Sequence, residues 1–562
     1  MSKSLYKDKR FGRDGISSNS SSRAASVSRT PLRSDDSDYE TDEENELIKI
    51  DELLREKLTS LQQQEIGETS KEDRIGMNDR RQYEASNLNK ARIQESSSIN
   101  EIIISLTFSR SDVSSQSREL LLAQLYKIIV SKSLLVYNEE QSGSLNYVEE
   151  DNVGKLISIL TTGNYRSDVE FLYLYRSIIA LICSDIDEFS GLISTDLLNY
   201  IQHLISEPAN GVITNENKAN LISGYVVLTL MLHNGSSSFG IDDKITLLME
   251  IAEGYCESAT ALKKEVESGN REHSTFITDK NLDKKLVNEA NLKVISEASV
   301  SISAIHGVGC LLTLISRGDF LNELCEDLMF KLVPLLDNDE NRDIAKAAGR
   351  VIGLIYELYD YSKSTDEDEE EEYNSNAPYY EQEKLIFILT RLLNLSSKKV
   401  ARKDKKDISS VFRNILNTIN VFTDKTKRDQ VLKKTGEGLE LSQTTIDFSY
   451  IKLSKYKSLR INSWFLYLRL RELRWCFSFG LHNQLVANDS IRDTLKEPEN
   501  EFSYGNHYDE VDDSYLDEEN SEILHEYMDQ KHLKNEKLRN EKRKKERLVK
   551  IGDQLEELNL DT

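Results

Sequence analysis

Apolar segments of helical length follow one another through most of the chain, from Ile102 to Phe422, with short polar breaks between them. In RELLLAQLYKIIV and RDIAKAAGRVIGLIYELY the apolar residues recur every three to four positions, which is the period of an α-helix. Others, such as DVEFLYLYRSIIALIC, are apolar on nearly every side and indicate helices packed on both faces. Successive helices of this kind, without a convincing strand signal, predict an all-α fold of the armadillo- or HEAT-like α-solenoid type, with a non-repetitive helical domain as the alternative.

The same pattern separates a folded middle from two polar ends. Low hydrophobicity and high charge leave the ends too little apolar surface to offset the entropy lost on ordering, so we expect disorder there. We therefore predict four regions: a disordered Ser-rich and acidic region at 1–100 with a short helix at 47–61, an armadillo-like helical repeat domain at 101–424 with an acidic loop at 365–380, a Trp- and Arg-rich helical motif at 445–496, and a tail at 497–562 that is first acidic and then basic, helical around 521–557.

The segment WFLYLRLRELRWCF, which starts at Trp464, carries apolar residues on two sides at helical spacing. Between residues 466 and 471 apolar and polar residues alternate, which is also compatible with a strand, but the length of the segment favours a helix. Arg469, Arg471 and Arg474 would then lie near one another at the edge of a mostly buried helix. We interpret them as long side chains that bury their stems and keep their charged ends in water, with a functional role as the alternative.

Charge changes the picture, because 97 acidic residues against 72 basic ones give the chain a net charge of −25. Repulsion should keep most of this surface away from nucleic acid, so dense positive clusters matter where they occur. One such cluster precedes an apolar helical pattern in KKVARKDKKDISSVFRNILNTI, and we predict that it binds an anionic partner from an ordered surface. Its candidate binding residues are Lys398, Lys399, Arg402, Lys403, Lys405, Lys406 and Arg413, and the residues expected to anchor it are Val411, Phe412, Ile415 and Leu416.

A second cluster lies in the tail, where the run from Lys531 to Lys550 has strong helix formers and almost no apolar stripe. We predict a helix that binds RNA or serves in nuclear import, with an inert charged tail as the alternative. Its candidate residues are Lys537, Arg539, Lys542, Arg543, Lys544, Lys545 and Arg547. Seven consecutive carboxylates, from Asp366 to Glu372, would form a solvated spacer or a shield for the basic cluster.

Catalytic and metal-binding patterns are missing from the sequence. It contains no phosphate-binding loop, no H-E-x-x-H and no G-x-S-x-G, and its five cysteines are scattered. His306 and Cys310 stand four residues apart, but on an apolar helix such a pair is interpreted as packing and not as a metal site. We therefore expect no enzymatic activity, no cofactor, no metal and no small-molecule substrate.

The start, MSKSLYKDKRFGRDG, has no apolar signal-peptide core, and no later stretch approaches about 20 uninterrupted apolar residues. Scattered cysteines fit a reducing compartment. We expect a soluble intracellular protein without a membrane partner, located in the cytoplasm, with the nucleus as a second location.

Four segments resemble the interferon-related developmental regulators. RKDKKDISSVFRNIL resembles that family's basic stretch leading into a Ser-x-Phe-Arg helix, and RDIAKAAGRVIGLIYEL resembles its Ala-Ala-Gly helix. INSWFLYLRLRELRWCFSFGLHNQLVANDSIRDTL resembles its C-terminal motif, with Trp464, Gly480 and His482 in the matching places. SRSDVSSQSRELLLAQLYKIIVSK is similar to its first helical repeat, so the resemblance covers roughly Ile102 to Leu495.

The resemblance implies an armadillo-like fold without enzymatic activity and two roles, association with ribosomes that are not translating and transcriptional co-regulation in the nucleus. The long acidic insert, the charged tails and the Arg-rich Trp464 helix depart from the family pattern. We expect a protein that binds ribosomes through rRNA phosphates and modulates translation or associates with idle ribosomes, without specific DNA sequence recognition. The alternatives are a nuclear scaffold that binds protein partners along the solenoid and an adaptor for acidic protein or membrane surfaces.

Overall fold

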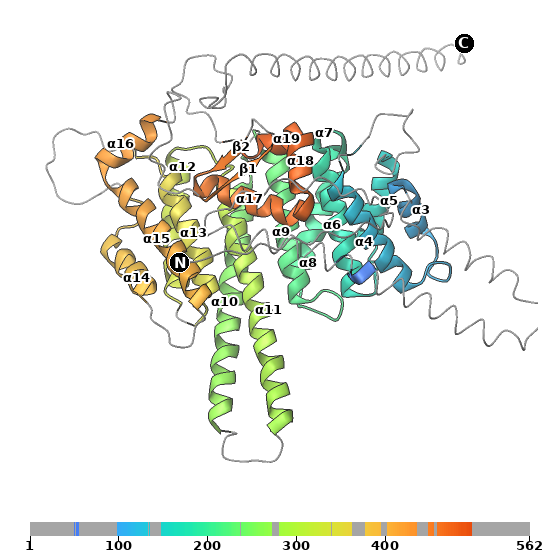
Figure 1. Ribbon diagram of the computed structural model, residues 1–562, viewed down its shortest axis with the longest axis horizontal. Coiled ribbons are helices and arrows are strands. Elements are labelled where there is room, and N and C mark those ends of the chain that lie inside the picture. Colours follow the sequence, from blue (N-terminus) through green and yellow to red (C-terminus); the bar gives the residue numbers. More distant parts are fainter. Residues whose placement is uncertain are drawn as a thin grey trace, which may run out of the picture.

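The structure is a computed structural model of the 562-residue chain (Figure 1). It describes residue 50 and the ranges 52–54, 98–132, 134, 148–235, 238–272, 280–338, 340–361, 377–394, 402–434, 448–453 and 458–496. Nearly all of the predicted region 1–100, most of the acidic loop and the whole tail lie outside the described residues. From the predicted short helix at 47–61, Ile50 is helical and buried against the core.

Twelve of the described helices form pairs along the chain, and in each pair the first helix packs against the second. The first helices, here called the A helices, are α3 (Ile99–Thr107), α5 (Glu150–Thr161), α8 (Thr195–Ser206), α10 (Ile241–Glu272), α12 (Asp319–Leu336) and α14 (Gln382–Asn394). The second, called the B helices, are α4 (Ser115–Ser131), α6 (Asp168–Ser184), α9 (Asn215–His233), α11 (Lys280–Leu312), α13 (Arg342–Leu358) and α15 (Arg402–Thr423). Short α7 (Ile186–Phe189) and η2 (Ser190–Leu192) connect α6 to α8, and α16 (Lys425–Lys434) follows α15.

The B helices form a continuous row, in which α4, α6, α9, α11, α13 and α15 each pack against the next. Figure 1 shows the pairs side by side, from the blue N-terminal pairs to the orange C-terminal ones. A single hydrophobic cluster extends through the whole row, because each inner B helix is covered on both sides by its neighbours. The all-α solenoid fold predicted from the apolar pattern is confirmed.

Helix starts follow from local side-chain chemistry. Ser98 begins α3 with a capping box: its Oγ accepts a hydrogen bond from the Glu101 N–H, and the Glu101 carboxylate accepts one from the Ser98 N–H. Ser167 and Thr214 cap α6 and α9 in the simpler way, through one hydroxyl oxygen. These polar residues set the breaks that the sequence shows between apolar segments.

The α10–α11 pair differs from the others in length, with 32 and 33 residues, and projects beyond them (Figure 1). Within α11, the stretch Asn288–Leu312 is long and apolar enough to cross a membrane, but 67% of its most apolar window is buried in the fold. A helix packed on both sides has this composition, so α11 is a core helix of the solenoid.

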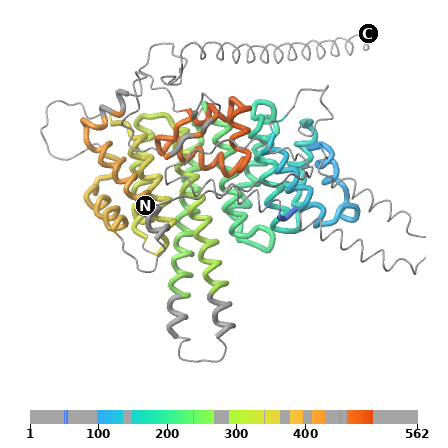
Figure 2. The backbone as a smooth tube through the Cα atoms, viewed as in Figure 1, coloured from blue at the N-terminus to red at the C-terminus, as the bar shows by residue number. Residues whose placement is uncertain are grey.

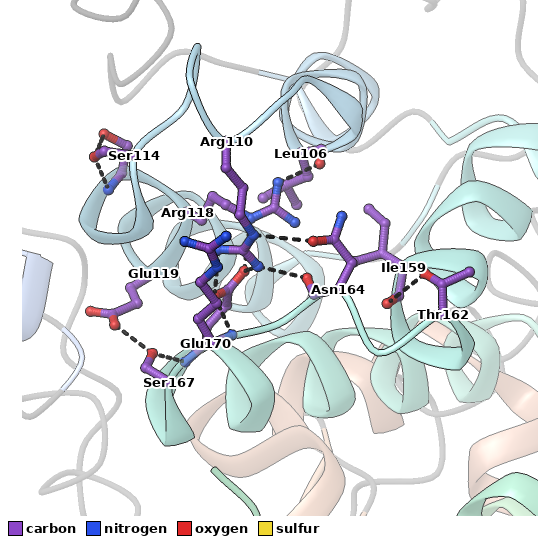
Figure 3. A network of polar contacts seen from close by, with 12 residues as sticks. Leu106, Arg110, Ser114, Arg118, Glu119, Ile159, Thr162, Asn164, Ser167 and Glu170 are labelled. Carbon is purple, nitrogen blue, oxygen red and sulfur yellow. Dashed lines mark hydrogen bonds and ion pairs between the residues drawn. The ribbon is translucent and has the colours of Figure 1, made fainter. Parts of the chain in front are cut away.

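Glu170 of α6 joins three segments at the N-terminal end (Figure 3). Its carboxylate is fully buried and accepts hydrogen bonds from Arg118 Nε of α4 at 2.7 Å and from Arg110 Nη2 at 2.9 Å. Arg118 also donates to the Leu106 carbonyl at the end of α3 at 2.6 Å, and Arg110 donates to the Asn164 carbonyl at 2.8 Å. The two arginines of the SRSDVSSQSR stretch therefore hold the first two helix pairs together.

After α16 the chain forms an antiparallel hairpin of β1 (Ser449–Lys452) and β2 (Ser458–Ile461), with Ser449 opposite Ile461. Next come α17 (Trp464–Phe477), η4 (Ser478–Gly480), α18 (Leu481–Ala487) and α19 (Asp489–Asp493). The expectation of a helical motif over 445–496 misses this hairpin, because strands of four residues are too short for alternation to stand out. Residues 466–471 are helical, as predicted from the length of the apolar segment that contains them.

Candidate anion-binding surface

The last described helices, α17 to α19 with η4, lie across the B-helix row and are here called the C-terminal clasp (Figure 2). Glu357, near the end of α13, holds the first turn of the clasp. The Trp464 N–H donates to its two carboxylate oxygens at 2.8 and 3.0 Å, and the Phe465 N–H donates to one of them at 3.2 Å. Because the first N–H groups of a helix have no partner inside it, a buried carboxylate there both satisfies them and complements the helix dipole.

Trp464 fixes the clasp to two B helices. It is completely buried, and its Nε1 donates to Thr418 Oγ1 of α15 at 3.0 Å. Its ring covers Gly353 of α13, where a Cβ would lie 2.6 Å from Trp464 Nε1. Only a residue without a side chain leaves room for the indole, so the Trp464 contact requires glycine at this position.

Arg469 has a different environment from the one expected. It is 4% exposed, and its guanidinium donates to Thr313 Oγ1 at 2.7 Å, to Asn234 Oδ1 at 2.9 Å and to the Thr494 carbonyl at 3.0 Å. The interpretation that its charged end stays in water is therefore wrong for this residue. Burial lowers its pKa to about 10, so it remains charged at neutral pH and links α17 to the ends of α9 and α11.

The far end of the clasp satisfies the terminal carbonyls of two B helices. Gln484 Nε2 donates to the Ile129 carbonyl at 3.0 Å and to the Lys132 carbonyl at 3.1 Å, at the end of α4. Asn488 Nδ2 donates to the carbonyl of Ser184, the last residue of α6. The clasp therefore connects the C-terminal ends of helices that are far apart in the sequence.

Cations gather where the clasp crosses α11 and α13. At their centre is His306 of α11, which is 1% exposed. Arg350 of α13 donates to His306 Nε2 at 3.4 Å and stacks over the Tyr467 ring of the clasp at 5.3 Å. The pKa of His306 is held well below its usual value. The largest cause is burial, and the positive charges of Arg471, Arg350 and Lys346 act in the same direction. Three cations from α13 and the clasp are therefore close enough to His306 to act on its charge.

These cations form one partly exposed area, here called the basic surface, made of Arg342, Lys346 and Arg350 on α13 and Arg471 on α17. The three α13 residues are spaced by four and therefore lie along one side of the helix. Lys346 is 22% exposed and pairs with Asp343 at 2.6 Å, while Asp343 itself is 67% exposed. An exposed pair of this kind holds its lysine weakly, so Lys346 remains able to contact another anion.

The acid nearest to Arg471 neutralises it only in part. Glu472 is 2% exposed and its carboxylate is 3.7 Å from the Arg471 Nε. Desolvation raises the pKa of Glu472 to about 7, although Arg471 and a hydrogen bond from Ser223 act in the opposite direction. The raised pKa favours the neutral acid, so Glu472 is a weak counter-charge for Arg471, which is 25% exposed.

Most side chains of the basic cluster predicted from the sequence are not described by the structure. Lys398 and Lys399 lie outside the described residues, and α15 begins at Arg402, although the side chains of residues 402–408 are not described. Arg413 is exposed on α15, and α15 is the helix that follows α13 in the row. The candidate residues of the tail, from Lys537 to Arg547, lie outside the described residues.

The residues expected to anchor this segment point into the solenoid to different degrees. Phe412 and Ile415 are fully buried and lie against Gly349 of α13, whereas Val411 and Leu416 are half-buried against the core. In the C-terminal motif, Gly480 is buried in the clasp, whereas His482 is exposed.

Sequence reasoning missed Lys346 and Arg350, because it searched for dense runs of charge along the chain. Their signal is a periodic one: Arg342, Lys346 and Arg350 recur every fourth residue in RDIAKAAGR, between apolar residues that are buried. A search for charge at helical spacing would have found them. The contribution of Arg471 could not be found this way, since it depends on the docking of α17.

The buried cysteines are poorly suited to act as nucleophiles. All five cysteines are buried and free, and burial raises the pKa of Cys183, Cys256, Cys310 and Cys325, which disfavours their thiolates. Within the described ranges, no group of three His, Cys, Asp or Glu side chains is arranged to hold a metal ion. The basic surface offers guanidinium and ammonium groups, which bind carboxylates and phosphates.

Residues 271–420 match the model of a protein family described as Interferon-related developmental regulator (IFRD). This part of the chain is similar to the IFRD family. The matched region runs from the end of α10 through α11, α12, α13 and α14 into α15, so it includes the α13 part of the basic surface and Arg413. No curated protein matches the chain in a sequence search.

The family match ends before the clasp, which contributes Arg471 and Tyr467 to the surroundings of His306. The basic surface is therefore made by the matched region together with a segment that follows it. Its assembly depends on the long-range contacts of Trp464 and Glu357.

Proposed function

We propose that this protein, which is similar to the IFRD family over residues 271–420, is a non-enzymatic helical-repeat protein that binds ribosomes in the cytoplasm and so modulates translation or associates with idle ribosomes. The observation that carries the proposal is the basic surface on α13 and the clasp, with Arg413 exposed on the neighbouring helix α15, in a chain whose net charge is −25. On a strongly acidic molecule, a local excess of cations directs an anionic partner to one place. Phosphate groups of rRNA are such a partner.

Contacts with phosphates are weakly selective individually, so recognition would depend on shape. The solenoid supplies a rigid shape, because the clasp ties the end of α13 to the ends of α4, α6 and α11. In this account the basic surface and the segment from Lys398 to Lys406 contact the rRNA backbone together, and the run from Lys531 to Lys550 adds a second RNA contact. The acidic parts of the chain limit binding elsewhere.

The competing hypothesis is a nuclear scaffold that binds protein partners along the solenoid. Much of the B-helix face is already covered by this chain's own clasp, which packs on α13, α11, α9 and α6. A partner peptide would need another face or would have to displace the clasp. This observation favours the ribosome hypothesis over binding of peptides along the B helices.

Gentle affinity purification distinguishes the two functions. The full chain, tagged and expressed at its natural level, should recover rRNA and ribosomal proteins at low salt and release them after ribonuclease treatment. A Lys346→Glu/Arg413→Glu variant should recover clearly less. The matched control is Lys384→Glu/Lys496→Glu, because each of these exposed lysines also pairs with a carboxylate three residues away. Recovery of transcription factors that resist ribonuclease, with equal amounts of rRNA for all variants, would contradict the proposal.

A further inference from the structure

Three aromatic side chains, one on α12, one just before α14 and one in the middle of α14, are exposed instead of buried. Phe330 is 54% exposed, Tyr380 is 72% exposed and Phe387 is 66% exposed. Large aromatic residues normally dominate cores and interfaces, so several exposed together mark an interaction site. Both helices belong to the C-terminal end of the solenoid (Figure 1).

The aromatic residues form one area because two contacts align the helices. The Phe330 ring lies 5.7 Å from the Tyr380 ring, just before α14, and Asp337 after α12 pairs with Arg391 near the end of α14. The contacts occur in the same order along both helices, so α12 and α14 run in the same direction. Phe387 therefore lies on α14 between the two contacts.

Buried Tyr379 supports the exposed rings. It is 6% exposed, its ring lies 5.4 Å from the Tyr380 ring and 6.2 Å from the Phe330 ring, and its hydroxyl donates to Glu381 at 3.3 Å. The exposed rings of Phe330 and Tyr380 are thus held in place by a fixed neighbour, which lowers the entropic cost of binding.

Carboxylates surround the aromatic residues. Glu323, Glu326 and Asp327 are exposed and stand seven, four and three residues before Phe330, on the same side of α12. On α14, Glu383 is exposed and stands four residues before Phe387. Lys331, Lys384 and Arg391 also belong to this part of the surface, but Lys384 pairs with Glu381 and Arg391 with Asp337, so carboxylates remain in excess. The area therefore combines net negative charge with the electron-rich faces of aromatic rings, both of which attract cations and repel phosphates.

We propose that this acidic aromatic surface binds a Lys/Arg-rich peptide segment of a partner protein. Guanidinium and ammonium groups would stack on the faces of Phe330, Tyr380 and Phe387, while the carboxylates of Glu323 and Asp327 pair with neighbouring cations. Its charge is opposite to that of the basic surface, so the two surfaces select different partners. The inference goes beyond ribosome binding and does not depend on it.

The test measures binding of three labelled twelve-residue peptides to the full chain by fluorescence anisotropy. One peptide is Arg- and Lys-rich, one has Gln in place of each cation, and one is Leu-rich and uncharged. The first should bind, and a Phe330→Ala/Phe387→Ala variant should bind it about tenfold more weakly, since each exposed cation–π contact contributes roughly 0.5–1 kcal/mol. Glu323→Gln/Asp327→Gln should weaken binding more at low salt than at high salt.

The matched control is Leu292→Ala/Ile295→Ala, which removes two side chains of α11 that are 65% and 63% exposed. It should bind the basic peptide as the unaltered chain does. Because the chain carries other acidic segments, unchanged binding by Phe330→Ala/Phe387→Ala would show that the peptide binds elsewhere and would overturn the proposal. Equal binding of the Leu-rich peptide would also overturn it, since the surface would then be an apolar site without preference for cations.

Discussion

At the scale of single residues, buried charges are the most sensitive points of the structure. Glu170 has no exposed surface, and it is the carboxylate that compensates the equally buried Arg118. Removing one partner of a buried ion pair leaves the other charge without compensation. The sequence places Arg118 at the start of a helix, but it gives no indication that Glu170, fifty-two residues later, is its partner.

Glu170→Gln should lower the free energy of unfolding by about 3–5 kcal/mol, because Arg118 would keep its charge in a buried place. Chemical denaturation of the full chain measures the change. Asp343→Asn is the matched control, since it removes an exposed ion pair with Lys346 and should cost less than about 1 kcal/mol. Equal effects of the two substitutions would contradict the assignment of Glu170 as the central charge of the N-terminal pairs.

Glu472 gives a prediction about pH. Its pKa rises on folding from 4.5 to about 7 because the carboxylate is desolvated. A raised pKa in the folded state contributes stability that is fully present below about pH 4.5 and is lost as pH rises through about 7. Glu472→Gln stays neutral, so at pH 8 it should be more stable than the unaltered chain by roughly 3 kcal/mol, and at pH 4.5 the two should be similar.

Thermal melts of both proteins at the two pH values measure this difference. His306 acts in the opposite direction, because its lowered pKa costs stability as pH falls below about 6.5, but it is common to both proteins and cancels in the comparison. Glu257→Gln, an exposed position on α10, is the control and should follow the unaltered chain at both pH values. A Glu472→Gln variant without a pH-dependent gain would exclude a buried carboxylate with a raised pKa.

At the scale of elements, the clasp is the feature that the sequence indicates least. The helix α17 is predicted correctly, since its apolar residues recur at helical spacing. Its position across the B helices depends on contacts such as Trp464 with Gly353 and Gln484 with the end of α4, and no local pattern specifies partners at such distances along the chain. The helix pairs of the solenoid, by contrast, are local and follow from apolar periodicity and polar caps.

Gly480 tests how tightly the clasp is docked. A Cβ at this position would lie 1.9 Å from the Val130 carbonyl oxygen, so Gly480→Ala requires the backbone to move and should cost about 1–3 kcal/mol or more. It should also increase cleavage of the clasp by a protease under native conditions. Gly254→Ala is the control, because nothing lies within 4 Å of that position in α10 and alanine favours a helix. Equal protease resistance of both variants would contradict close docking of the clasp.

At the scale of the whole molecule, charges of opposite sign are separated on the surface. The basic surface lies where α11, α13 and the clasp meet, whereas α12 and α14 present aromatic rings and carboxylates that outnumber the cations there. The fold class could be predicted because it depends on the apolar pattern, and the basic segment near Arg402 could be recognised because its charges are contiguous. Lys346 and Arg350 could not be recognised from the density of charge along the chain, since they become neighbours of Arg471 only after α17 docks on α13.

The most direct measurement of the central proposal is co-sedimentation of the full chain with purified ribosomes over a series of salt concentrations. The charge-reversed chain carries Glu at Lys398, Lys399, Arg402, Lys403, Lys405 and Lys406, and the control chain carries Glu at Lys384 and Lys496. We predict that the charge-reversed chain leaves the ribosomes at moderate salt, whereas the control sediments with them. Its binding should also depend less on salt, with a slope smaller by about one unit for each phosphate that it no longer neutralises. Undiminished sedimentation of the charge-reversed chain would contradict binding through this basic region.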